Sequence, residues 1–154
     1  METKRDPVRE FLGSVKEARF NKNRCLTRIK TAEAECERVT AQISGAPGGG
    51  GDLHKDGAWA ALADLRSLLL SCYTDALTKE REVEEFITSI PTDTYRIILR
   101  LRYVDCLRWP IVLEHLEKRN LPMSDRQMFR LHGEALHEAR KLWAELHPEE
   151  DSVE

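Results

Sequence analysis

Two runs of apolar residues repeat at alternating steps of four and three, one on each side of a glycine-rich segment. This period is typical of long α-helices that pack along a seam. The first run predicts a helix over about 7–44, and the second predicts a helix over 58–90. The segment between them, 45–57, predicts a flexible connector, because Pro47 has no N–H donor and glycines lose much conformational entropy on ordering. We therefore expect a long antiparallel helical hairpin.

Each predicted seam is apolar except for one lysine. The first seam is Phe11, Val15, Ala18, Lys22, Cys25, Ile29, Ala32, Cys36, Val39 and Ile43; the second is Leu62, Leu65, Leu69, Cys72, Ala76, Lys79, Val83, Phe86 and Ile90. Folding the helices together across the connector places Cys25 opposite Ala76, and Lys22 then meets Lys79. Two facing ammonium groups repel each other, so we interpret Lys22 and Lys79 as a register device or an oligomerisation contact.

A different pattern begins after Pro91, which ends the second helix. Residues 95–103 predict a short helix that is followed by a turn at 105–107. Trp109 and Pro110 open another helix, since proline fits the first helical turn, where its missing N–H costs nothing. Ser124 is a good N-cap for a last helix that runs to about 147.

The expected fold is therefore all-α. A helical hairpin at 1–90 precedes a three-helix unit at 91–147, and an acidic tail follows at 148–154. Three helices with a turn before a capped last helix make a helix-turn-helix arrangement.

The distribution of charged residues favours this C-terminal unit as the site of any nucleic-acid binding. The formal net charge of the whole chain is -3, so any affinity for nucleic acid must come from a local patch. Residues 95–130 provide one, with 8 bases against 4 acids. Arg126, Gln127 and Arg130 lie on the expected outer face at the start of the last helix. Arginine can bind guanine bidentately and glutamine can bind adenine, so these residues are candidates for reading base edges.

Several neighbours complete the candidate DNA-binding site. Asp125 follows the capping serine, and the residues suited to phosphate contacts are Ser124, Arg108, Lys118 and Arg119. The three tryptophans, Trp59, Trp109 and Trp143, are interpreted as packing residues.

The segments YRIILRLRYVDCLRWPIVLEHL and SDRQMFRLHGEAL are similar to the C-terminal region of sigma-factor-like phage regulators of the ArpU/RinA type. In that family an L-R-Y turn leads to a tryptophan-started helix and then to a serine-capped recognition helix. The resemblance implies the fold of sigma factor region four and a base-facing set of Asp125, Arg126, Gln127 and Arg130. The sequence departs from the family in its longer spacing, since fifteen positions separate Trp109 from Ser124.

The sequence offers no support for catalysis or for a cofactor. The four cysteines are far apart without a C-x-x-C pair, and no nucleophile elbow, Walker loop or H-E-x-x-H motif is present. We therefore expect no enzyme activity, no cofactor and no metal. The longest apolar run is too short for a signal core or a membrane span, so we expect a soluble intracellular protein with no membrane partner. The resemblance to phage regulators implies that this compartment is the cytoplasm of a bacterial host cell.

The function expected from these observations is that of a phage or prophage transcriptional regulator that binds double-stranded DNA, most simply as a homodimer. Its hairpin would serve oligomerisation or contact with host RNA polymerase. One alternative is a small terminase-like DNA-packaging subunit, which would assemble into rings. A second alternative is a module that binds a host protein and does not read DNA.

Overall fold

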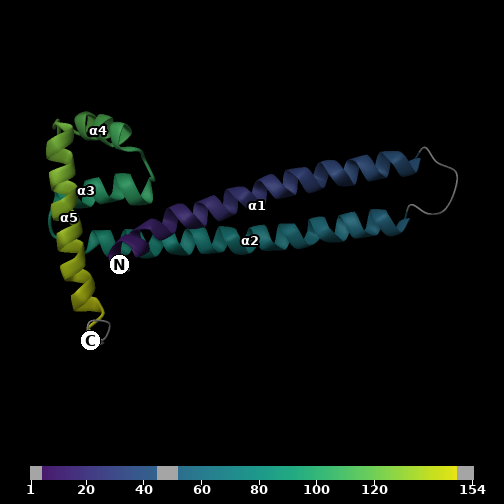
Figure 1. Cartoon of the computed structure of the whole chain (residues 1–154), viewed down its shortest axis with the longest axis horizontal. Helices are drawn as coiled ribbons and strands as arrows, with labels where there is room; N and C mark the ends of the chain where they lie inside the picture. Colours follow the sequence, from purple (N-terminus) through teal and green to yellow (C-terminus); the bar gives the residue numbers. More distant parts are fainter. Residues whose placement is uncertain (1–4, 45–51, 149–154) are drawn as a thin grey trace. The chain divides into compact units, whose positions relative to one another are not determined.

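The computed structural model describes residues 5–44 and 52–148. Within these residues the fold is all-α, as predicted, and the first two helices are long and packed antiparallel (Figure 1). The α-helices are α1 (Pro7–Ser44), α2 (Asp52–Thr88), α3 (Asp93–Leu99), α4 (Trp109–Lys118) and α5 (Asp125–Leu146). A π-helical turn, η1 (Arg100–Val104), continues α3.

The chain forms two compact units whose boundaries differ from the predicted division at residue 90. We call residues 17–77 the hairpin unit, and residues 5–16 together with 78–148 the terminal unit. Val8 and Leu12 from the start of α1 and Ile87 from the end of α2 are buried in one core with Leu136 of α5. The large apolar residues at these helix ends therefore pack with the C-terminal helices.

The first helix matches its prediction, whereas the second begins earlier than expected. The α1 helix runs without interruption through Gly13. The α2 helix starts at Asp52, so the prediction that 52–57 belong to the connector is wrong. Gly57 costs only about 1 kcal/mol in a helix interior, and no proline and no other glycine occurs in 52–57, so these residues can extend the helix. The rest of the predicted connector, 45–51, lies outside the described residues.

This earlier start changes the level at which the two helices meet. The Lys22 Nζ atom lies 4.8 Å from the centre of the Tyr73 ring, whereas Lys79 forms an ion pair of 3.8 Å with Glu82 on its own helix. Tyr73 precedes Lys79 by six residues, or about 9 Å along a helix axis. The predicted pairing of Lys22 with Lys79 is thus incorrect, because a shorter connector moves the register by more than one helical turn.

The terminal unit also contains a second core, which positions α4 and α5. Its buried residues are Ile98, Leu101, Val112, Leu116 and Met128. The α4 helix ends where Asn120 adopts a positive φ of 60°, and the Leu121 N–H donates to the Leu116 carbonyl over 2.9 Å. This left-handed C-terminal motif stops the helix and turns the chain toward Ser124.

The three tryptophans differ in their surroundings. Trp143 packs against Phe11 at a ring-centroid distance of 4.9 Å, and Trp109 packs against Phe129 at 5.1 Å, so the prediction of packing is confirmed for both. Trp59 on the hairpin unit is 44% exposed, and for this residue the prediction is wrong.

Candidate nucleic-acid interface

The start of α5 is built as the sequence predicts. The Ser124 hydroxyl accepts a hydrogen bond of 3.2 Å from the Gln127 N–H, which is an N-cap. Met128, on the opposite side of this first turn, is buried in the core beneath α4. Anchoring Met128 inward turns Arg126 and Gln127 outward, and both are exposed.

The outward residues line a shallow depression. Its walls are Ser124, Arg126, Gln127 and Arg130, and its volume is about 440 Å³. Arg130 is held loosely, with its Nε 3.7 Å from a carboxylate oxygen of Glu134, and its side chain remains 67% exposed. The depression therefore presents two guanidinium groups and one amide on the first two turns of a helix, where the helix dipole also favours negative partners.

Three further bases lie at the ends of α4. Arg108 is the N-cap residue of α4, Lys118 is in its last turn and Arg119 is its C-cap residue. All three are exposed. In Figure 1 α4 lies beside the N-terminal end of α5.

The structure divides the predicted basic segment into engaged and free side chains. Arg96 pairs with Asp93 at 2.9 Å, Arg100 pairs with Glu84 at 2.6 Å, and Arg102 donates to the Leu107 carbonyl. The free set, which has no ion pair within residues 5–44 and 52–148, is Arg108, Lys118, Arg119 and Arg126. The engaged arginines therefore stabilise the fold, and the free ones remain available to an anionic partner.

An aromatic cluster that the sequence analysis missed holds α5 against α4. The Trp109 ring lies 4.7 Å from His132 and 5.1 Å from Phe129, and the Arg102 guanidinium lies 4.7 Å from the Trp109 ring. The Tyr103 hydroxyl and the His132 Nε2 atom are 3.0 Å apart. Phe129 is exposed and precedes Arg130 on α5, so it could contact a ligand directly. In the sequence, the only indication that Phe129 belongs to this site is its position between the inward Met128 and the outward Arg130.

His132 of α5 faces this cluster. Burial, together with the smaller effect of the charges of Arg9, Arg102 and Arg140, lowers the pKa of His132 to about 4. The imidazole is therefore neutral near pH 7 and serves as a packing and hydrogen-bonding group.

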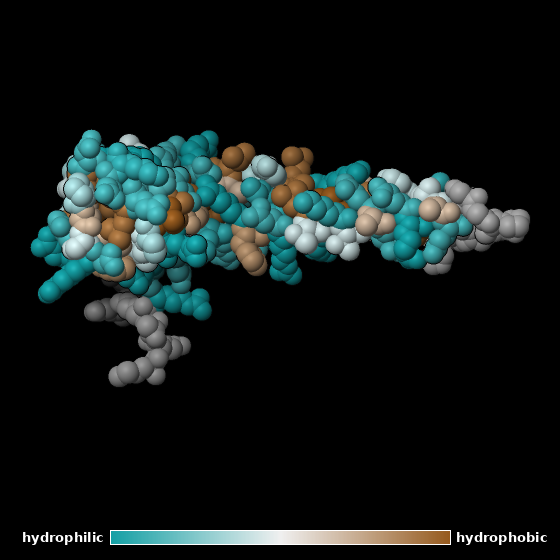
Figure 2. Space-filling model, turned by 90° about the horizontal axis from the view of Figure 1, so that it is seen from above, coloured by the Kyte–Doolittle hydropathy of each residue, from teal (hydrophilic) through white to brown (hydrophobic). Residues whose placement is uncertain are grey.

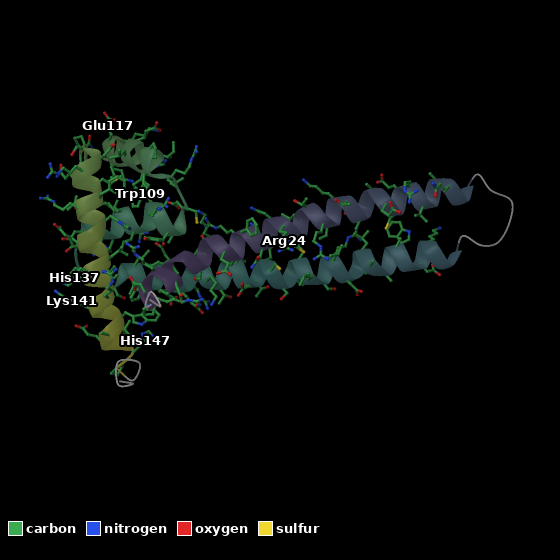
Figure 3. All side chains as sticks on the ribbon, viewed as in Figure 1. Arg24, Trp109, Glu117, His137, Lys141 and His147 are labelled. Atoms are coloured by element: carbon green, nitrogen blue, oxygen red, sulfur yellow. The ribbon has the colours of Figure 1, made fainter. Side chains whose placement is uncertain are left out.

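The opposite end of α5 has other partners. Lys141 pairs with Glu138 at 3.3 Å, and the Arg140 guanidinium pairs with Asp6 at 2.7 Å. His137, Lys141 and His147 lie along this second half of the helix (Figure 3). The two halves of α5 thus differ, and only the first carries a set of free basic side chains.

No group of His, Cys, Asp and Glu side chains suited to a metal ion occurs among the residues that the structure describes. None of the described helices is long and apolar enough to cross a membrane. Comparisons with models of protein families, with curated proteins and with solved structures found no match.

Proposed function

We propose that this chain is a transcriptional regulator that reads double-stranded DNA with the first turns of α5, in the manner of the phage regulators that its C-terminal segment resembles. The observation that carries the proposal is the free basic set, Arg108, Lys118, Arg119 and Arg126, around a serine-capped helix start. Nothing in the described fold uses these charges, whereas the neighbouring Arg96 and Arg100 are both engaged.

The base-reading part of the site is Arg126, Gln127 and Arg130. Each guanidinium can donate two parallel hydrogen bonds to O6 and N7 of guanine, and the glutamine amide can pair with N6 and N7 of adenine in the major groove. Asp125, also exposed, can accept a hydrogen bond from N4 of cytosine.

The other residues position the duplex. Arg108, Lys118 and Arg119 would neutralise phosphates, and the Ser124 hydroxyl can add a phosphate contact. Since each neutralised phosphate releases counterions, affinity should fall steeply with salt concentration.

The test is a binding assay with purified full-length protein, using DNA from the intergenic regions beside its own gene and random duplex of equal length. Arg126→Ala and Arg130→Ala should each weaken binding to the preferred sequence by about 1–3 kcal/mol and reduce the preference over random DNA. Lys118→Ala and Arg119→Ala should weaken binding to both duplexes alike and reduce the salt slope by about 1.

Lys141→Ala is the matched control, because Lys141 is an exposed base on the second half of the same helix. It should leave binding unchanged. Equal losses for Arg126→Ala on both duplexes would show that Arg126 contacts phosphate only. Absence of binding to any duplex at low salt would overturn the proposal and favour a module that binds a host protein.

A further inference from the structure

The α2 helix of the hairpin unit carries a second apolar stripe, beside the one that faces α1. The stripe follows steps of four and three and consists of Trp59, Ala63, Arg66, Leu70, Tyr73 and Leu77. Leu70 is 71% exposed and Leu77 is 62% exposed, while Leu62 and Ala76 on the inner stripe are buried. Figure 2 shows large hydrophobic side chains standing out from the surface of the hairpin.

The exposed stripe is bordered by side chains of α1 on one side. The Lys22 ammonium stacks on the Tyr73 ring, and the Arg66 guanidinium pairs with Glu33 at 3.3 Å. These contacts leave the outer surfaces of Leu70 and Leu77 uncovered. The result is a face two helices wide, with apolar side chains on α2 and a polar border on α1.

We propose that this stripe is the surface through which two copies of the chain associate, with their α2 helices antiparallel about a two-fold axis. The inference is independent of DNA reading. The spacing of the stripe is symmetric about residue 68, so an antiparallel partner would place Trp59 opposite Leu77 and Ala63 opposite Tyr73. Large side chains then meet smaller ones, and Trp59, Leu70, Tyr73 and Leu77 are all covered at once.

The charges of the hairpin unit favour the same orientation. On α1, residues 19–30 contain five bases and no acid, whereas residues 33–37 contain three acids. An antiparallel partner places the basic part of one copy beside the acidic part of the other. A parallel partner would align like charges, which is unfavourable.

The area available is sufficient for a dimer of modest affinity. The stripe from Trp59 to Leu77 extends over about 27 Å of helix, and two adjacent helices are about 20 Å wide. Two such faces bury roughly 1,000 Å² in total, which is near the lower limit for specific interfaces. We therefore expect association at micromolar protein concentrations.

The first experiment measures the mass of the full-length chain by sedimentation equilibrium between about 1 and 100 μM, the micromolar range expected for an interface of this size. The unsubstituted chain should form a dimer. Leu70→Glu combined with Leu77→Glu should weaken association at least about 100-fold, because two apolar side chains lose their burial. Both residues are exposed in the single chain, so the circular dichroism spectrum should not change.

Leu68→Glu is the matched control. Leu68 is a leucine of the same helix with 45% exposure, but it points about 200° away from Leu70 around the axis. This variant should remain a dimer. A monomeric unsubstituted chain at 100 μM, or equal weakening by Leu68→Glu and by the double variant, would overturn the proposal. A ring of eight or more copies would also overturn it and would favour the packaging subunit.

A second experiment tests the antiparallel register by oxidation of mixed chains. One chain carries Trp59→Cys, the other carries Leu77→Cys and a tag, and the unsubstituted chain gives the baseline for the native cysteines. The mixture should form the mixed disulfide, and neither chain alone should form more disulfide-linked dimer than the baseline. Cross-linking of each chain with itself in place of the mixed product would contradict the antiparallel arrangement.

Discussion

The two compact units contain the same kind of secondary structure and use their apolar residues differently. The terminal unit buries Leu12, Ile87 and Leu136 completely or nearly so. The hairpin unit has a core of small residues with few large ones, namely Cys25, Ile29, Cys36 and Leu62, while Leu70 and Leu77 remain outside. Since burial of apolar area is the main source of stability, the terminal unit is expected to be the more stable of the two as a single chain.

The two units also differ in the kind of side chain that they leave exposed. In the terminal unit the apolar surface is mostly covered, and what remains free is a group of charges at the start of α5. In the hairpin unit Arg66 pairs with Glu33 and Lys22 is stacked on Tyr73, and large apolar side chains such as Leu70 and Leu77 remain exposed. The comparison suggests an anionic partner for one unit and an apolar partner for the other.

The sharpest test of this comparison uses one residue type in both units. Trp109→Ala should lower the free energy of unfolding of the terminal unit by about 3 kcal/mol, because Trp109 joins Phe129, His132 and Arg102. Trp59→Ala should change the stability of the single hairpin by less than about 0.5 kcal/mol. Urea unfolding followed by circular dichroism, at protein concentrations below the dimer range, measures both. Equal losses would contradict the comparison.

The pH dependence of the terminal unit should come from His132. An unfolded histidine titrates near pH 6.5, whereas the pKa of His132 in the fold is about 4, so the unfolded state binds the proton first on acidification. The contribution of neutral His132 to the free energy of unfolding is fully present above about pH 6.5. The free energy of unfolding should decline by about 2 kcal/mol as the pH falls toward 4.

Urea titrations at several pH values check this prediction. In His132→Gln the decline between pH 6.5 and 4 should be much smaller, even if the variant is less stable at pH 7. His137→Gln is the control, because His137 is exposed further along α5. A decline of unchanged size in His132→Gln would assign the pH dependence to other groups.

The helix cap of α5 should have an effect of intermediate size. Ser124→Ala removes the hydrogen bond to the Gln127 N–H and should destabilise the terminal unit by about 1 kcal/mol. Ser67→Ala, at an exposed position in the middle of α2, should have no such cost, since alanine is the better helix former there. Thermal melts of the two variants side by side make the comparison. A loss in Ser67→Ala as large as that in Ser124→Ala would refute a specific role of the cap.

The smallest expected effects are stabilising. An added Cβ at Gly57 of α2 or at Gly133 of α5 would meet no atom within 4 Å. Alanine at either position should stabilise its own unit by about 0.5–1 kcal/mol, because it reduces the entropy cost of forming the helix. If the two units unfold separately, Gly57→Ala should raise one transition and Gly133→Ala the other, as seen by calorimetry. A single transition that shifts equally in both variants would show that the units unfold together.

Local sequence patterns predicted most of the helices and several of their boundaries. Apolar periodicity identified α1 almost to the residue, the Trp109-Pro110 pair marked the start of α4, and Ser124 marked the start of α5. Each of these signals acts within a few residues of the feature it predicts, through capping, proline geometry or the period of the helix.

One failure was local, and the other features that the sequence did not predict depend on distant parts of the chain. The glycines of the connector suggested that 52–57 could not be helical, but α2 extends to Asp52. The sequence also did not predict the π-helical turn η1 or the inward orientation of His132. Both depend on packing between helices that are distant in the chain, which a local pattern does not contain.

By itself the amino-acid sequence determined the all-α class, the helix faces and the concentration of basic residues in 95–130, because helical period and composition are properties of short segments. Tertiary structure decided the register of α1 against α2, and therefore that Lys22 meets Tyr73 and not Lys79. It also decided which arginines are engaged and which are free, and which leucines of α2 stay exposed. These outcomes depend on connector length and on packing between residues far apart in the chain, which the local pattern does not contain.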